Sequence, residues 1–274
     1  MEHLRIEDDG AVRSLVLCRP AAYNTITEGL RVELDTALDE AFADPSIRVV
    51  LLRAEGPAFC AGYDLAWGVE ATAAEQEWDP MIDFHHLIGP FVATFHRLFS
   101  GPKPTVAAVQ GWCIGGGTDL VLCADLVVAA DDAVFGYPPA RVWGIPTTGM
   151  WVARLGLERA KRYLFTGDEI PAAEAARIGM ILEVVPGSRL EQSAAALAGR
   201  IARLPANQLA MTKAMLNRQV AGDIEIGRLL GTLFDGIARH TPEGSAFVAR
   251  AAEAGFRQAV RERDEPFGDY GSRT

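Results

Sequence analysis

The sequence lacks the features of a membrane protein or a secreted one. No apolar run reaches the roughly 18 residues that a membrane-spanning helix needs. The N-terminal segment MEHLRIEDDG is acidic and has neither the basic nor the apolar part of a signal peptide. We therefore expect a cytoplasmic protein.

Cysteine and histidine are scarce, and neither forms a metal or redox motif. The 274 residues contain four cysteines, which are Cys18, Cys60, Cys113 and Cys123. No two of them have the spacing of a zinc or redox motif, so we interpret them as small buried residues. None of the five histidines forms an HExxH-type signature, and no metal is expected.

Basic residues are outnumbered by acidic ones. The 26 lysines and arginines against 36 aspartates and glutamates give a net charge of −10. Such a balance disfavours a nucleic-acid-binding protein, which needs a basic face. The balance does not exclude a small anionic ligand, because local backbone amides can hold one.

The sequence also lacks the motif of a nucleophilic hydrolase. No Ser or Cys occupies a Gly-x-Ser-x-Gly elbow, which disfavours this class of enzyme.

Strands and helices alternate in the first half of the chain. Two short strands are predicted around the Asp9-Gly10 turn, followed by a helix that Thr27 caps and that ends before Pro45. The apolar run 49–52 predicts a strand buried on both faces. The segments PTVAAVQG and LVVAADDAVFG predict further short strands. From about residue 150 amphipathic helical runs dominate, which predicts an α/β core followed by a helical subdomain.

Glycine, in contrast, is concentrated in GWCIGGGTDLVLCADLVVAA, where Gly115–Gly117 stand between a predicted strand and a predicted helix. Bare backbone lets amides approach a ligand closely, and a helix start adds free N–H groups and a positive dipole end. Thr118-Asp119 replaces the Lys-Ser/Thr of a Walker loop, and Leu120 replaces the third glycine of a dinucleotide fingerprint. The stretch therefore indicates a different site for negative charge, with tight strand–helix packing as the alternative.

A second stretch, GPAFCAGYDLAWG, also follows a predicted strand. It places Gly62 directly before Tyr63, whose backbone N–H is a potential donor. Two such turns with free amides could converge on one oxygen, which would form an oxyanion hole.

Several separate motifs resemble, in order and spacing, the crotonase (enoyl-CoA hydratase/isomerase) superfamily. They are FCAGYDL, PTVAAVQGWCIGGGTDLVLCADLVVAADDAVFGYPP, RAKRYLFTGDEIPAAEAARIGM, the early RPAAYNTIT and the late HTPEGSAF. The resemblance covers about residues 4 to 260. It implies an α/β fold made of a spiral of ββα units, with a C-terminal helical subdomain that is used for trimer formation.

The resemblance also implies a division of the chain and its partners. We expect the spiral core and the acyl-CoA site in residues 1–200, a helical trimerisation region in 201–263 and an irregular tail in 264–274. The implied substrate is an acyl-CoA thioester, and the implied assembly is a homotrimer or hexamer. No separate cofactor is expected, since coenzyme A is part of the substrate.

By resemblance, the backbone N–H groups of Tyr63 and Gly116 form the oxyanion hole, and Asp119 handles a proton. A developing enolate gains charge in the transition state, where preorganised donors stabilise it most. Further residues are expected to border the coenzyme or the acyl group. They are Cys60, Ala61, Gly62, Asp64, Leu65, Gly115, Gly117, Tyr137, Pro139 and Arg250.

The sequence departs from the superfamily at its catalytic acids. Hydratases use two glutamates, and the first position holds the shorter Asp119. The second position holds Pro139, whose side chain cannot carry a proton. The candidates for the missing role are Tyr137 and Arg141, which flank Pro139, and His85 and His86, which lie in the segment expected to line the acyl pocket. For the two histidines, solvated surface is the alternative.

Three functions remain open at this point. The first is an enoyl-CoA hydratase that works with Asp119. The second is another reaction through the same enolate hole, such as isomerisation, thioester hydrolysis or carbon–carbon cleavage. The third is an acyl-CoA-binding protein without turnover, which Pro139 makes conceivable.

Overall fold

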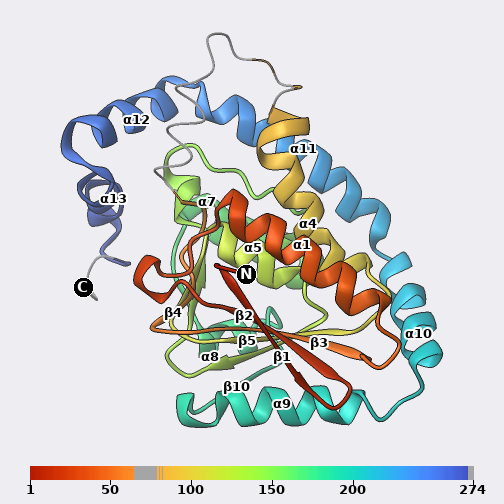
Figure 1. The fold of residues 1–274 in the computed structure, drawn as a ribbon. Helices are drawn as coiled ribbons and strands as arrows, with labels where there is room; N and C mark the ends of the chain where they lie inside the picture. The colour runs from red at the N-terminus through yellow and green to blue at the C-terminus, as the bar shows by residue number, and fades with distance from the viewer. Residues whose placement is uncertain (65–78, 80, 82, 271–274) are drawn as a thin grey trace.

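The computed structural model describes residues 1–64, 79, 81 and 83–270, and Figure 1 shows two β-sheets with helices packed around them. One sheet has six strands in the order β1-β2-β3-β5-β7-β10, and the other has four in the order β4-β6-β8-β9. The strands are β1 (Leu4–Asp9), β2 (Val12–Leu17), β3 (Val49–Ala54), β4 (Ala58–Cys60), β5 (Thr105–Val109), β6 (Trp112–Ile114), β7 (Leu126–Ala130), β8 (Val134–Gly136), β9 (Ile170–Pro171) and β10 (Glu183–Val185).

The chain visits the two sheets in turn, which makes the fold a spiral. Strands β3, β5 and β7 lie side by side and parallel in the large sheet. Each is followed after a short turn by β4, β6 or β8, which pair in parallel in the small sheet. Helix α4 (Ile88–Ser100) leads from β4 back to β5 in the large sheet, and helix α5 (Gly116–Leu122) leads from β6 back to β7. The expected spiral of ββα units is confirmed, as is the antiparallel hairpin β1–β2.

Strands β3, β5 and β7 of the large sheet are buried on both faces, as the continuous apolar runs predict. Successive side chains point to opposite faces, so each strand feeds two apolar layers. One layer contains Val50, Leu52, Ala107, Val109, Val127 and Ala129. The other contains Val49, Leu51, Val106, Ala108, Val128 and Ala130. The second layer is closed by α9 (Leu190–Ile201), which Figure 1 shows running along the lower side of the sheet.

The first layer is closed by helices on the opposite side of the sheet (Figure 1). Helix α1 (Glu28–Ala43) begins where the predicted cap, Thr27, accepts the N–H of Leu30 at 3.2 Å. The remaining α-helices of the described chain, whatever their place, are α4 (Ile88–Ser100), α5 (Gly116–Leu122), α6 (Met150–Leu155), α7 (Leu157–Thr166), α8 (Ala172–Arg177), α10 (Ala206–Arg218), α11 (Ala221–Arg239), α12 (Pro242–Ala254) and α13 (Phe256–Asp264).

Short helical turns complete the described chain. They are the 3-10 turns η1 (Pro20–Ala22), η3 (Pro138–Arg141), η4 (Gly187–Arg189) and η5 (Glu265–Phe267), together with the π-helix η2 (Asp83–Leu87). In this part of the chain, no helix has both the length and the apolar character to cross a membrane.

Helix α11 carries the C-terminal region back over the core. It packs against α4 and α6, and Figure 1 shows it beside α4. Its Gly231 lies so close to the loop before α6 that a Cβ there would be 2.3 Å from the carbonyl oxygen of Pro146. Helix α11 is therefore in backbone contact with the loop that joins η3 to α6.

Gly117 is needed at the start of α5 because a Cβ there would lie 2.3 Å from the carbonyl oxygen of Cys60. We predict that Gly117→Ala destabilises the protein by about 1–3 kcal/mol, as overpacking of a dense core does. The measurement is the thermal midpoint at fixed protein concentration, followed by circular dichroism.

Gly199→Ala is the matched control. Gly199 lies inside α9, where an added Cβ would meet nothing within 4 Å. This change should stabilise the protein by about 0.5–1 kcal/mol, because alanine loses less backbone entropy in a helix. Equal midpoints for the two variants would contradict the prediction.

Candidate active site

Two glycine-containing turns meet at one edge of the small sheet. Strands β4 and β6 are parallel neighbours, so the segments that follow them leave the sheet at the same end. A Cβ on Gly62 would lie 3.1 Å from the carbonyl oxygen of Ile114 and 3.4 Å from the amide nitrogen of Gly116. The predicted convergence of the two turns is therefore present in the structure.

A larger residue would not fit without strain at any of the three consecutive glycines, for a different steric reason at each. Gly115 has a φ of 57°, which lies in the left-handed region that favours glycine. A Cβ on Gly116 would be 2.7 Å from the ring of Tyr63, and Gly117 abuts the carbonyl of Cys60. Tight strand–helix packing, the alternative considered for this stretch, is thus real. It is also what brings the amide of Gly116 next to the second turn.

The backbone amides of Tyr63 and Gly116 are both available to a ligand. Around Tyr63, Ile26 donates its N–H to Gly62, and Asp64 donates its N–H to Ile26, so the Tyr63 N–H is left out of this pairing. Gly116 is the first residue of α5, where N–H groups have no partner inside the helix. Within the described residues, neither amide donates to a protein acceptor. Two such donors in contact segments are the elements of an oxyanion hole.

Asp119 lies in the first turn of α5 and is fully buried. Its Oδ1 accepts from Trp151 Nε1 at 2.9 Å and from Thr148 Oγ1 at 3.4 Å. Its Oδ2 accepts from the N–H of Thr147 at 3.1 Å and from its hydroxyl at 3.4 Å. Burial raises the pKa of Asp119 to about 6, and these donors limit the rise. Asp119 therefore titrates near neutral pH, as proton transfer requires.

Two tyrosine side chains flank this carboxylate. The ring of Tyr63 contacts Phe91 edge-on at 5.5 Å between centroids, and its hydroxyl is buried without a hydrogen bond of normal geometry. The hydroxyl of Tyr137 donates to the carbonyl of Ile145 at 2.8 Å. Burial, together with the charges of Asp119 and Asp235, raises the pKa of both phenols well above the usual range. Both phenols are therefore neutral near pH 7.

Asp235 is a second buried carboxylate that the sequence analysis did not find. It lies on α11, is 5% exposed, and accepts the N–H of Ile145 at 3.1 Å. Burial raises its pKa to about 7, and the charge of Asp119 contributes. A pattern in the sequence could have identified Asp235, because it is an acid on the buried face of an amphipathic helix. Positions 224, 231 and 239 share that face with it.

Pro139 lies close to the glycine turn, but its side chain offers no proton. It lies in η3, and its ring carbon Cγ would be 3.5 Å from a Cβ on Gly115. The side chain thus faces the glycine turn. Its carbonyl accepts the N–H groups of Val142, Trp143 and Gly144, which fixes the loop that follows.

Arg141, a candidate for the missing acid, has a different task in this structure. It donates to both carboxylate oxygens of Asp269 at 2.7 Å and to Asp264 at 3.0 Å. Its guanidinium also lies 3.9 Å from the ring centre of Phe267. These contacts attach the segment 264–270, which was expected to be an irregular tail, to the loop that carries Pro139. Part of that segment forms η5.

The histidine candidates and Arg250 lie in other surroundings. His85 and His86 are exposed on η2, as the alternative interpretation of solvated surface predicts. Arg250 lies on α12 and is paired with Glu262 at 2.7 Å and Glu253 at 2.9 Å. Its charge is therefore balanced within the protein.

The remaining predicted binding residues follow β4. Cys60 is fully buried, and burial raises the pKa of its thiol to about 12. Ala61 is partly exposed and donates its N–H to the carbonyl of Tyr23. Asp64 accepts from the hydroxyl of Thr25 at 3.2 Å. Leu65 lies outside the described residues.

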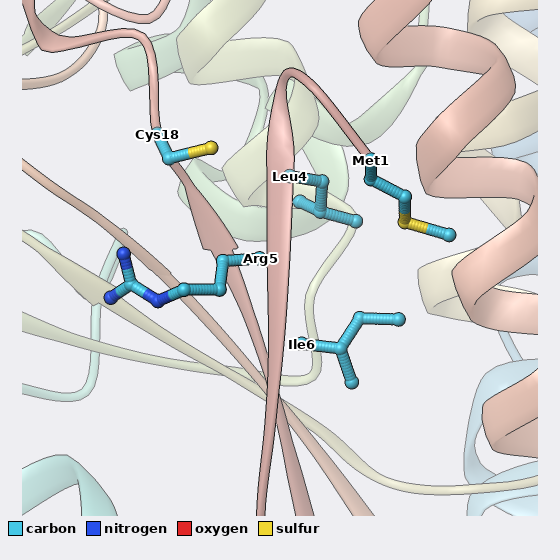
Figure 2. A pocket seen from close by; sticks show the side chains of 5 residues that line it. All are labelled: Met1, Leu4, Arg5, Ile6 and Cys18. Atoms are coloured by element: carbon cyan, nitrogen blue, oxygen red, sulfur yellow. The ribbon is translucent and has the colours of Figure 1, made fainter.

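A cavity of about 370 Å³ lies away from these residues. Figure 2 shows its lining, which is Met1, Leu4, Arg5, Ile6 and Cys18. Arg5 is paired there with Glu7 and Glu55, and burial raises the pKa of the Cys18 thiol, so neither group is reactive. In the described ranges, no group of three or more His, Cys, Asp or Glu side chains could hold a metal.

The ββα spiral and the paired amides define a crotonase-type protein. A model of the enoyl-CoA hydratase/isomerase family matches residues 7–229, and the chain belongs to this family. The crystal structure of an enoyl-CoA hydratase from Mycobacterium smegmatis superimposes with a TM-score of 0.93 at 43% identity, over 99% of this chain and 96% of that one.

Two further relatives agree with this assignment. An enoyl-CoA hydratase/isomerase structure from Xanthobacter autotrophicus Py2 has a TM-score of 0.88 at 30% identity, over 96% of this chain and 98% of that one. The enoyl-CoA isomerase/hydratase of Mycosarcoma maydis is 31% identical over 229 residues, which cover 79% of this chain and 80% of the relative.

We predict that Arg141→Met destabilises the protein by about 3–5 kcal/mol. Arg141 has 1% of its side chain exposed, and its removal takes the guanidinium from two carboxylates, Asp269 (13% exposed) and Asp264 (3% exposed). Of these, Asp264 keeps Arg263 as a partner. The measurement is the thermal midpoint.

Arg177→Met is the control, because Arg177 is 69% exposed and solvent screens its pair with Glu174, which should therefore contribute little to stability. Similar losses in both variants would show that the cluster does not stabilise the fold.

Proposed function

We propose that the protein is an acyl-CoA-processing enzyme, most simply a 2-enoyl-CoA hydratase. The observation that supports this most is the pair of backbone amides, of Tyr63 and Gly116, that have no acceptor in the described protein. They meet beside Asp119, a buried carboxylate that titrates near pH 6. The names of the relatives, enoyl-CoA hydratase and hydratase/isomerase, supply the substrate class.

The chemistry follows from where charge develops. When a nucleophile adds to the β-carbon of a 2-enoyl thioester, electrons move onto the thioester oxygen. The N–H groups of Tyr63 and Gly116 donate to that oxygen and stabilise the enolate more than the neutral thioester. Each such donor lowers the barrier by roughly 3 kcal/mol. The segment from Cys60 to Asp64 would then border the coenzyme.

Asp119 is proposed to accept a proton from the attacking water. It follows Gly116 by three residues, so it lies within one helical turn of the hole. Its many donors hold it in one orientation, which keeps its oxygens fixed relative to the two amides. A buried carboxylate with this pKa is ionised in a large fraction of molecules at pH 7.

We predict that the protein consumes a short-chain or a long-chain 2-enoyl-CoA and that Asp119→Asn lowers kcat by about 10²–10⁴-fold. The reason is that an amide cannot accept the proton of water, while general base catalysis contributes a factor of this size. The measurement is loss of the conjugated thioester absorbance, with identification of the product as 3-hydroxyacyl-CoA.

Asp9→Asn is the matched control, since Asp9 is exposed at the β1–β2 turn. Its kcat should equal that of the unmodified protein. A different product would move the assignment to another reaction of the enolate, such as isomerisation. If calorimetry showed acyl-CoA binding but no turnover were found, the protein would be assigned as an acyl-CoA-binding protein instead of an enzyme.

We also propose that the chain forms a homotrimer or hexamer through the region 201–263. Helices α10 and α11 expose an unusual number of large apolar side chains, which favours an interface. They are Met211, Met215, Leu216, Ile226, Leu229, Leu230, Phe234 and Ile237.

We predict a solution mass of three or six chains of 29.5 kDa, and a smaller mass for Ile226→Glu. Ile226 is 60% exposed on α11, and a charge there would be desolvated in the assembly. Sedimentation equilibrium measures both masses. Phe165→Glu on α7 is the control and should leave the mass unchanged, because Phe165 is 81% exposed outside this region. A mass of one chain for the unmodified protein would overturn the proposal.

A further inference from the structure

The reaction proposed above uses one carboxylate, Asp119, but hydration needs two proton transfers. Addition of water removes a proton from water and delivers a proton to the α-carbon. Pro139 supplies no group for the second transfer. Asp119 contributes to the raised pKa of several buried side chains, among them Tyr63, Tyr137 and Asp235. Asp235 is the one carboxylic acid among these three.

Asp235 reaches this place because α11 touches the loop that joins η3 to α6. A Cβ on Gly227 would be 3.0 Å from the Cα of Gly149, and one on Gly231 would be 2.3 Å from the oxygen of Pro146. Bare backbone at both positions permits the contact. Asp235 follows Gly231 by four residues, so it lies on the same face of the helix, one turn further on.

The two carboxylates hold the same loop from two helices. Asp235, from α11, accepts the N–H of Ile145 at 3.1 Å. Asp119, from α5, accepts the N–H of Thr147 at 3.1 Å. Ile145 in turn accepts the hydroxyl of Tyr137 through its carbonyl. Three residues of loop therefore connect both acids and one of the phenols.

We propose that Asp235 is the second catalytic carboxylate of this site and performs the proton transfer for which Pro139 has no group. The inference rests on the proposed function, since it assigns a residue to the proton transfers at the α-carbon. It places the second acid on α11 instead of on the loop after β8.

In the proposed hydration, each proton and electron pair has a defined donor and acceptor. Water gives a proton to the ionised Asp119 while its oxygen bonds to the β-carbon, and the double-bond electrons move to the thioester oxygen. The enolate, held by the amides of Tyr63 and Gly116, then takes the proton of neutral Asp235 at the α-carbon. The product is the 3-hydroxyacyl thioester. Asp119 ends protonated and Asp235 ionised, and one proton returns from the first to the second through solvent.

The protonation states agree with this order. The pKa of Asp235 is about 7 and that of Asp119 is about 6, so the pair most readily holds one proton with Asp235 as the acid. The phenols of Tyr63 and Tyr137 have pKa values too high to exchange protons as readily. Arg239, 3.9 Å from Asp235 Oδ2, is the charged neighbour on the same helix.

The test is Asp235→Asn, because asparagine keeps an oxygen for the N–H of Ile145 and replaces the titratable oxygen by an NH2 group that does not change its charge near neutral pH. Two rates are measured. One is hydration of 2-enoyl-CoA, and the other is solvent deuterium exchange at the α-carbon of butyryl-CoA, which needs the enolate but no water addition. Both should fall by about 10²–10⁴-fold, with butyryl-CoA affinity unchanged by calorimetry. Retention of both rates within tenfold would overturn the proposal and leave Asp235 as a support of the loop.

Asp223→Asn is the control, as it makes the same change at an exposed position of α11. Folding of the Asp235 variant is checked by its thermal midpoint. The raised pKa means that Asp235 adds stability at acid pH that is lost as pH rises through about 7. The variant should therefore melt above the unmodified protein at pH 8, and the difference should shrink towards pH 5.

Measurements on the unmodified protein separate this inference from the proposed function. Its kcat should fall below about pH 6 and above about pH 7, as a base and an acid of the cited pKa values require. Deuterium exchange that depends on Asp235, without hydration, would reject the hydratase assignment and support the role of Asp235. Absence of both activities from the unmodified protein would reject both proposals.

Discussion

The close approach of two backbone turns is the constraint on which the site depends. Gly62 and Gly116 lie in segments that follow neighbouring strands of the small sheet, and a Cβ on Gly62 would already be 3.4 Å from the amide nitrogen of Gly116. A Cβ on Gly62 would force its backbone neighbours back by a few tenths of an ångström, and one on Gly116 would clash with the ring of Tyr63. Either change would move the amides of Tyr63 and Gly116 relative to each other. Packing and chemistry thus have the same cause, so the steric and the functional interpretation of the glycines are not alternatives.

Burial is the second condition. Asp119 lies on the helix that follows the second turn and has no exposed surface. A carboxylate in such a place is stable only with donors around it, and Trp151, Thr147 and Thr148 supply them. Desolvation still outweighs the donors and keeps the pKa near neutrality. The same balance acts on Asp235, which accepts the N–H of Ile145 and lies near a like charge.

The sequence predicts what is local in this protein. The Thr27 cap and the buried strand β3 depend on neighbouring residues only, and both are confirmed. The two amide-bearing turns could also be predicted, because each is a short stretch after a strand, and the family resemblance joined them. The three-residue strands β4 and β6 were not predicted as such, since so short a run shows no periodicity.

Contacts between distant segments account for what could not be predicted. Asp235 and Ile145 are 90 residues apart, and their hydrogen bond depends on how α11 crosses the loop. Arg141 and Asp269 are 128 residues apart, and the polar composition of the C-terminal segment gave no sign of their ion pair. No pattern within either segment encodes the partner, because the partner is chosen by the tertiary fold.

These two contacts have a common consequence for the site. The loop from Tyr137 to Gly149 carries Pro139, at the position where the family resemblance implies an acid, and it is held by the C-terminal region at two points. Asp235 on α11 holds one point, and Asp264 and Asp269 hold Arg141 at the other. An acid on the loop itself would be in place whenever the loop is folded. An acid on α11 acts only when the C-terminal helices are in place, so the proposed proton transfer would be coupled to the packing of a region that also exposes the apolar side chains of the proposed interface.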